Sequence, residues 1–124
     1  MAVTGDPMIR DRTDNFSPAA RAVGGAVLLV NLFTAKAGME DRFIEAQTGE
    51  YVRLRGKVEG WIGNRLGRSV DGGQIVNVAM FDSLENYNAW RAGALFQEHL
   101  EVIRPFVETS APGMYELLYS AGDL

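Results

Sequence analysis

Apolar residues run through two short segments of the chain, residues 26–34 and 75–81, each interrupted by one asparagine. Runs of this length are typical of strands that are buried on both faces. Residues 61–68 predict a third, glycine-rich strand, and the turn at 71–73 predicts that it forms a hairpin with the next one. Alternating residues at 114–119 predict the last strand.

Between the strands, apolar residues recur every three or four positions, which is the period of an amphipathic helix. One such stripe predicts a helix over residues 39–58. An Asp-Ser cap at 82–83 begins a second helix, Gly93 interrupts it, and a stripe over 96–107 predicts a further helical piece that ends at 112–113. The order β-α-β-β-α-β predicts an α+β, ferredoxin-like fold with an antiparallel sheet and both helices on one face.

The chain of 124 residues is long enough for one domain with one core. Residues 1–24 show no sustained hydrophobic period, so we interpret them as a flexible N-terminal leader and residues 25–124 as the folded domain. No apolar stretch approaches the roughly 18 residues of a membrane span, and the polar N-terminal stretch lacks the apolar middle of a signal peptide. We therefore expect a cytoplasmic protein.

Composition excludes several classes of function. The absence of cysteine removes disulfides, thiolate nucleophiles and thiolate metal sites together. The single histidine and the scattered carboxylates form neither a catalytic triad nor a metal-ligand pattern. The net charge is −4 with both signs interspersed, which gives no electrostatic footprint for nucleic acid or an anionic membrane.

The first and third strands are apolar at successive positions, and successive side chains of a strand point to opposite faces. A sheet that is covered by helices on one side only should instead alternate polar and apolar residues. The second face therefore needs a cover. In a chain this small the expected cover is a second copy of the sheet, so we predict a homodimer, with a pocket wherever side chains leave the interior unfilled.

Asn31 and Asn77 are the polar residues that interrupt the two apolar strands. A buried carboxamide costs roughly 1–3 kcal/mol unless it is hydrogen-bonded. Two of them indicate a shared polar spot, such as a small-molecule pocket, in an apolar interior. The alternative is that each asparagine lies at a bulge or strand end and bonds the nearby backbone.

Over residues 26–120 the chain resembles the antibiotic biosynthesis monooxygenase superfamily, the dimeric α/β-barrel proteins. The resemblance rests on the strand with Asn31, on Trp61 at the start of the second strand, on the strand that runs from Asn77 to Phe81, and on the helix at 82–90. It implies a ferredoxin-like domain that pairs with a second copy to form the barrel. Several chemistries use this scaffold, so the activity has to come from the pocket.

One branch of that superfamily is the cofactor-independent anthrone oxygenases of aromatic polyketide pathways, in which an asparagine on the first strand and one on the third lie in the pocket. Asn31 and Asn77 match those positions, and Tyr87 matches a pocket tyrosine of some members. Phe81 stands where that branch carries a tryptophan. Asn77 and Phe81 are an even number of residues apart on a strand and therefore share a face.

This resemblance implies an oxygenase that acts on a fused-ring phenolic substrate, such as a polyketide intermediate, and gives a quinone or a cleaved ring. Carboxamides suit this chemistry because they stabilise a developing phenolate or carbanion that donates an electron to dioxygen. The electrons would come from the substrate or from a diffusible reduced flavin, with no tightly bound metal or cofactor. The expected catalytic residues are Asn31, Asn77, Trp90 and His99, and the expected substrate-binding residues are Phe81, Tyr87, Phe43, Tyr51 and Trp61.

A second branch, the bacterial heme-degrading oxygenases, resembles the chain through Asn31, Trp90 and His99. Nine residues of one continuous helix turn about 900°, which would set Trp90 and His99 on opposite faces. Both can line one pocket only if the helix breaks between them, and Gly93 offers such a break. This alternative would bring heme as the cofactor.

A third alternative is a dimeric barrel without redox chemistry, either a binding protein or a cyclase that acts on a polyketide chain. The predicted sheet would be the same in all three cases. Consumption of dioxygen with an aromatic substrate would separate an oxygenase from this alternative, and a Soret band after addition of hemin would separate the heme branch from both.

Overall fold

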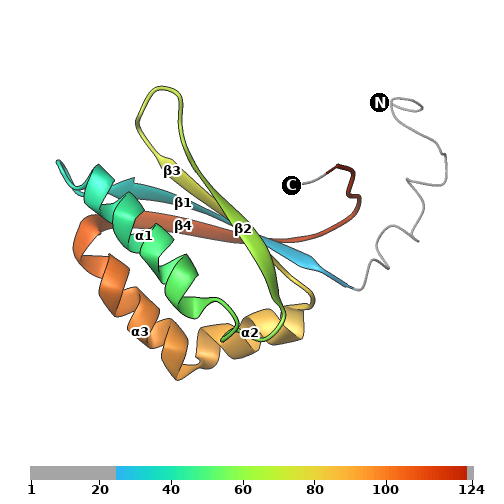
Figure 1. Cartoon of the computed structure of the whole chain (residues 1–124). Helices are drawn as coiled ribbons and strands as arrows, with labels where there is room; N and C mark the ends of the chain where they lie inside the picture. The colour runs from blue at the N-terminus through green and yellow to red at the C-terminus, as the bar shows by residue number, and fades with distance from the viewer. Residues whose placement is uncertain (1–24, 123–124) are drawn as a thin grey trace, which may run out of the picture.

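The computed structural model describes residues 25–122, and the predicted leader at 1–24 lies outside the described residues. The described residues form four strands and three helices, whose arrangement is drawn in Figure 1. They are β1 (Val27–Ala35), α1 (Glu40–Leu54), β2 (Trp61–Arg68), β3 (Ile75–Phe81), α2 (Leu84–Ala92), α3 (Ala94–Ile103) and β4 (Val107–Glu116), with a 3-10 turn at Arg104–Phe106 before β4.

The strands form one antiparallel sheet in the order β2-β3-β1-β4. The three helices lie on the same side of this sheet (Figure 1). The predicted β-α-β-β-α-β order and the ferredoxin-like α+β fold are therefore confirmed, with the second helix divided into α2 and α3. Ser83 caps α2 as predicted, because its side chain accepts a hydrogen bond from the backbone N–H of Asn86 at 3.1 Å.

The C-terminal part of the prediction was wrong, because α3 ends at Ile103 and β4 begins at Val107 rather than at residue 114. Pro105 lies in the 3-10 turn, and a proline has no backbone N–H to donate to the hydrogen bonds of a continuing α-helix. Pro112 lies inside β4 opposite Asn31. A proline fits there because β4 is the edge strand of this sheet and pairs on one side only.

The predicted helix over 39–58 is also shorter in the structure, since α1 ends at Leu54. Gly56 follows with a positive φ of 79°, a backbone conformation that glycine adopts without steric cost. The chain therefore leaves the helix there. Val58, which was expected on the helical stripe, lies instead in the loop after α1 and packs against the buried cluster that contains Phe81 and Tyr87.

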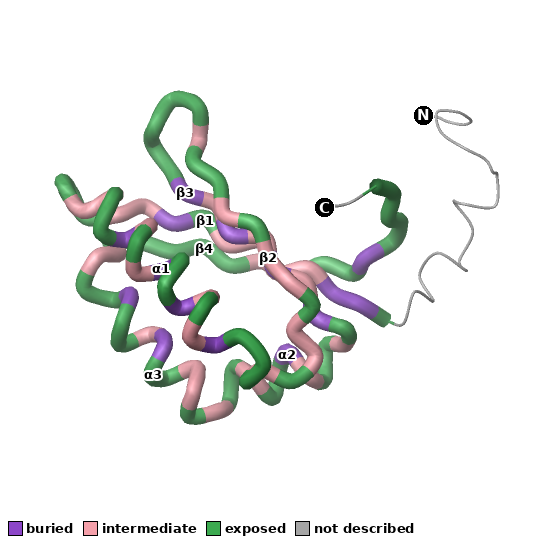
Figure 2. The backbone as a smooth tube through the Cα atoms, in the orientation of Figure 1, coloured by how far each residue is buried: buried purple, intermediate pink, exposed green. Residues whose placement is uncertain are grey.

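The buried core lies between the sheet and the helices and consists of two clusters (Figure 2). One contains Phe33, Phe43, Ile75 and Ile103, and the other contains Val27, Phe81 and Tyr87. Both clusters take residues from the same faces of β1 and β3. Asn31 and Asn77 fall between the two clusters on those faces, so the polar residues separate two apolar regions.

The opposite face of the sheet carries the alternate residues of β1 and β3, and in the described residues no helix covers it (Figure 1). These residues are apolar, and Leu32 is 39% exposed. They are Leu28, Val30, Leu32, Val76, Val78 and Met80, which we call the open sheet face. The expectation that both strands are apolar on both faces is confirmed; the homodimer that it suggested stays a prediction.

Candidate functional site

A cavity of about 480 Å³ lies between the sheet and the helices and takes lining residues from all four strands and all three helices. Apolar and aromatic side chains make up most of its wall, and a few polar side chains converge on it. Volume and composition are typical of a pocket for a small organic molecule.

Eight of the nine residues predicted to form the site line this one cavity, although they come from six different elements. The exception is Phe43, which is fully buried in the core, with its ring centroid 4.9 Å from that of Phe33. The inward stripe of α1 therefore divides between core and cavity, and Phe43 belongs to the core. The eight lining residues are Asn31, Tyr51, Trp61, Asn77, Phe81, Tyr87, Trp90 and His99.

Asn31 and Asn77 are direct cross-strand neighbours in the β1–β3 ladder. Oδ1 of Asn77 accepts two hydrogen bonds, from the Tyr51 hydroxyl at 2.9 Å and from Nδ2 of Asn64 at 3.0 Å. Neither asparagine lies at a strand end or at one of the register shifts of the sheet, which occur at 34/35 and 61/63. The two asparagines therefore lie together in one polar part of the cavity. The alternative, in which each asparagine lies at a bulge or strand end and bonds the nearby backbone, does not describe this arrangement.

A buried glutamine extends this polar group onto α1. Gln47 is 2% exposed, and its Nε2 donates a hydrogen bond to the Tyr51 hydroxyl at 2.9 Å. Burial raises the pKa of Tyr51 to about 12, so this hydroxyl stays protonated at neutral pH and donates to Asn77. Sequence reasoning treated Gln47 only as a member of the helical stripe. An amide inside an otherwise apolar stripe was the signal that it belongs to a site.

Two oxygen atoms in this group lack a hydrogen-bond partner among the described residues, Oδ1 of Asn31 and Oε1 of Gln47. Both atoms are buried, and both residues line the cavity. A buried acceptor without a partner costs about 1–3 kcal/mol.

Trp90 and His99 meet because the helix breaks at Gly93. Their ring centroids are 6.1 Å apart, and Phe96 packs edge-on against Trp90 at 5.4 Å. The extended backbone of Gly93, with φ −93° and ψ 168°, changes the direction of the chain between α2 and α3. The break that the sequence indicated thus allows both rings to line one cavity.

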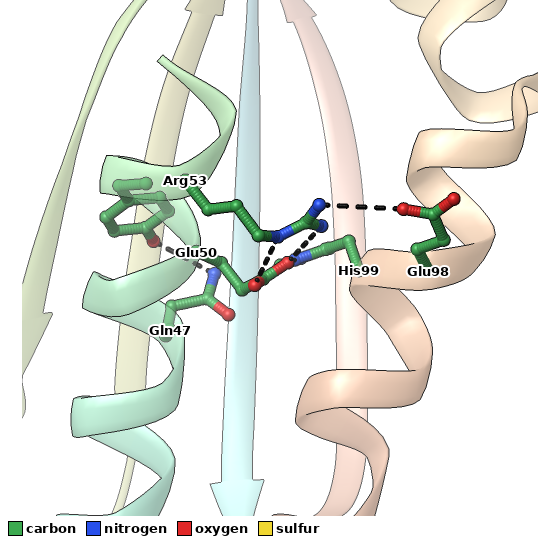
Figure 3. A network of polar contacts seen from close by, with 6 residues as sticks. Gln47, Glu50, Arg53, Glu98 and His99 are labelled. Carbon is green, nitrogen blue, oxygen red and sulfur yellow. Dashed lines mark hydrogen bonds and ion pairs between the residues drawn. The ribbon is translucent and has the colours of Figure 1, made fainter. Parts of the chain in front are cut away.

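His99 is paired with a buried carboxylate on α1 (Figure 3). Its Nδ1 lies 3.2 Å from Oε1 of Glu50, and Glu50 also accepts two hydrogen bonds from Arg53, both at 2.8 Å. Hydrogen bonding to Arg53 is the largest cause that lowers the pKa of Glu50, whereas burial lowers the pKa of His99 and outweighs the effect of Glu50. The pair is therefore a carboxylate beside a neutral imidazole, with the ring proton on Nδ1.

Sequence reasoning missed Glu50, and its spacing was the available signal. It lies three residues after Gln47 and four before Leu54, and all three are buried on one face of α1. Arg53 and Glu98 complete the polar network at the surface, with an ion pair at 3.5 Å (Figure 3).

Within residues 25–122, no group of three or more histidine and carboxylate side chains is placed to hold a metal ion. None of the described helices combines the length and apolar character needed to cross a membrane.

The fold and the site together define a small ferredoxin-like protein with an aromatic-lined ligand cavity between its sheet and its helices. The chain belongs to the antibiotic biosynthesis monooxygenase family, whose sequence model matches residues 26–102. No curated protein matches the chain significantly.

Several solved structures share the fold. SnoaB, a cofactor-independent oxygenase from Streptomyces nogalater, is 22% identical in a mutant form, with a TM-score of 0.65 over 73% of this chain and 91% of its own. A protein from Nitrosomonas europaea, described as an antibiotic biosynthesis monooxygenase, is 16% identical, with a TM-score of 0.67 over 80% of this chain and 96% of its own. A Shewanella oneidensis protein is 21% identical, with a TM-score of 0.63 over 74% and 90%.

Proposed function

We propose that this protein is an oxygenase that converts a fused-ring phenolic substrate, of the kind made by aromatic polyketide pathways, into a quinone with dioxygen and without a tightly bound cofactor. The observation that carries the proposal is the cross-strand pair of Asn31 and Asn77 inside an aromatic-lined cavity. Membership of the monooxygenase family supports it, and so does the shared fold with a cofactor-independent oxygenase.

The reaction balances with dioxygen alone. A ring CH₂ of an anthrone and one O₂ give a ring carbonyl and one water, so the substrate supplies all four electrons. The step that the protein has to assist is removal of the first proton, because the resulting anion is the species that passes an electron to dioxygen. Recombination then forms the C–O bond, and loss of water gives the carbonyl.

His99 supplies the base in this proposal. With its proton on Nδ1 facing Glu50, the neutral imidazole has an unprotonated Nε2 that accepts the substrate proton. The ionised Glu50 then stabilises the imidazolium that forms, as a carboxylate does beside histidine in other enzymes.

Asn77 stabilises the substrate anion. Its Oδ1 is occupied by two donors, and no described residue accepts a hydrogen bond from its Nδ2. That amide N–H group is therefore available to a developing negative oxygen, the arrangement by which fixed donors lower a reaction barrier.

The aromatic side chains hold the substrate rings. Phe81 and Tyr87 pack edge-on, with their ring centroids 5.4 Å apart. Tyr51 and Trp61 form a second pair of rings in the cavity wall, with centroids 6.4 Å apart. Trp90 adds a ring beside His99. Flat apolar walls of this kind bind a planar polycyclic molecule and exclude water from the reacting anion.

We also propose that the protein is a homodimer in which two open sheet faces pack against each other. Burial of this apolar surface is favourable by about 25 cal/mol per Å². The pairing would place one cavity on the outer side of each sheet.

The proposal is tested by oxygen uptake with 1,8-dihydroxyanthrone and by mass analysis of the product. Asn31→Ala and Asn77→Ala should each lower kcat by roughly 100-fold, as loss of a transition-state hydrogen bond does in other oxyanion sites. Asn88→Ala, an exposed asparagine on α2, is the control and should keep full turnover. Full turnover in both cavity variants would refute the carboxamide mechanism. A ring-cleaved product, or a requirement for reduced flavin, would replace quinone formation.

Heme degradation is a second candidate, because Asn31, Trp90 and His99 line the same cavity. Hemin titration of wild type and His99→Ala separates the two candidates. A stoichiometric Soret shift that is lost in the variant would assign the cavity to heme. Binding of aromatic ligands without a Soret shift and without oxygen uptake would assign it to a non-redox binding protein or cyclase.

A further inference from the structure

We propose that Arg91, at the mouth of the cavity, binds a carboxylate of the ligand, so that the substrate is an aromatic acid whose rings enter the cavity while its acid group stays at the surface. This inference rests on the proposed function, since it names the chemical class of the substrate of the same cavity. Arg91 takes part in no chemical step here. It binds the substrate and positions it.

The exposed residues among those that line the cavity locate its mouth. None of them comes from β1, α1, β2 or β3, and all lie on α2, on the 3-10 turn or on β4. The cavity is therefore open on the side that these three segments bound. The six exposed lining residues are Arg91, Arg104, Glu108, Thr109, Ser110 and Pro112.

Arg91 lies in the last turn of α2, with its guanidinium group against two rings of the cavity wall. Its Cζ atom is 6.0 Å from the ring centroid of Tyr87 and 5.5 Å from that of Phe96. Aromatic faces attract the cation and restrain it, but they accept none of its hydrogen bonds in the plane of the guanidinium. No ion pair or side-chain hydrogen bond of Arg91 is found among residues 25–122. Its N–H donors are therefore available to a ligand.

The other charges of the cavity wall favour Arg91 as the anion site. Arg104 is the second arginine of the mouth, but Glu108 follows it by four positions and carries the opposite charge. No acidic residue lies within four positions of Arg91. In the interior, burial lowers the pKa of His99 and raises the pKa of Tyr51 to about 12, so both groups are neutral at pH 7.

An acid group is stabilised at Arg91 and destabilised deeper in the cavity. A guanidinium binds a carboxylate through two parallel, charge-assisted hydrogen bonds. Further inside, the same carboxylate would exchange water for a largely apolar wall, which is costly for an unpaired charge.

This anchor also directs the rings toward the proposed base. The ring of Phe96, against which Arg91 packs, has its centroid 6.3 Å from that of His99. A ligand held at Arg91 therefore extends past Phe96 toward His99 and presents the same ring position to the base in each binding event.

The test compares two ligands of nearly the same shape that differ in charge, anthracene-2-carboxylate and anthracene-2-carboxamide. Neither has a ring CH₂ to oxidise, so calorimetry with the full chain at neutral pH measures binding alone. Wild type should bind the carboxylate roughly tenfold more tightly than the amide. In Arg91→Gln the two affinities should become equal while that for the amide stays within about twofold of wild type. Arg91→Lys should keep part of the preference, because it retains the charge and loses the planar fork.

Two further variants decide whether the position matters or only the net charge. Arg42→Gln removes the same charge from an exposed position of α1 that does not line the cavity, and Arg104→Gln removes the other arginine of the mouth. Both should keep the preference for the carboxylate. Equal affinity of wild type for the two ligands, binding of neither, or a preference that is lost in Arg104→Gln and kept in Arg91→Gln would overturn the inference.

The proposed oxygenase fails on a different result. A carboxylate preference that depends on Arg91, without oxygen uptake on any phenol, would refute the oxygenase and leave the acid site in place. Oxygen uptake on 1,8-dihydroxyanthrone without any carboxylate preference would overturn the acid site and leave the oxygenase.

Discussion

Tyr51→Phe is the change that tests the polar group most directly, because it removes one oxygen atom and leaves the ring. That oxygen joins α1 to β3 through bonds of 2.9 Å to Gln47 and 2.9 Å to Asn77. Asn77 keeps the hydrogen bond from Asn64 at 3.0 Å, so its acceptor stays satisfied. The Gln47 amide, at 2% exposed, loses its acceptor, and a buried donor without a partner costs about 1–3 kcal/mol.

We therefore expect the free energy of unfolding to fall by about 2 kcal/mol, or roughly 30-fold in the equilibrium constant. The assay is urea unfolding followed by tryptophan fluorescence, at one fixed protein concentration because a dimer adds concentration dependence.

Tyr87→Phe is the matched control for this measurement. Tyr87 is 3% exposed, and no hydrogen bond of its hydroxyl is found among the described residues. Its loss should therefore change the free energy of unfolding by less than about 0.5 kcal/mol. If the two variants are equally stable, the hydrogen-bonded chain from Gln47 to Asn77 does not contribute as described.

Three further predictions concern pH, assembly and the core. Burial lowers the pKa of His99, so below about pH 6.5 the unfolded chain binds more protons than the folded chain. The free energy of unfolding should therefore decrease as pH falls through that range. Urea midpoints measured between pH 8 and 5.5 should show this decrease in wild type and not in His99→Gln. Val78→Glu on the open sheet face should sediment as a monomer, whereas Val52→Glu, at 65% exposed on α1, should sediment as wild type; two identical profiles would contradict the proposed dimer. Phe43→Ala should lower the free energy of unfolding, measured in urea, by about 3–5 kcal/mol. A smaller loss would show that the surrounding core closes over the space left by the deleted ring.

Local patterns along the chain were sufficient to predict much of the fold. The glycine-rich stretch at 61–68 and the apolar run at 75–81 gave the bounds of β2 and β3 as the structure has them. The Ser83 cap and the Gly93 break were recognised because capping and helix interruption depend on neighbours in sequence. The start of β4 was missed. The apolar stripe of α3 continues numerically to Val107, and only pairing with β1 decides that this residue belongs to a strand.

The site divides in the same way between sequence and structure. Asn31 and Asn77 stand out in the sequence, since a polar residue inside an apolar strand is visible without a structure. Their pairing depends on the β1–β3 register, which joins positions far apart in the chain. Gln47 and Glu50 differ from ordinary helix residues only through what packs against them, namely Tyr51, His99 and the cavity wall.

The amino-acid sequence by itself thus determined the order of elements, the two apolar sheet faces and the two carboxamides, because these follow from side-chain polarity and local backbone preference. Only the tertiary structure decided which oxygens lack a partner, which carboxylate faces the histidine and which aromatic ring belongs to the core. Those properties depend on contacts between elements, and a contact is set by register and packing rather than by the identity of either residue alone.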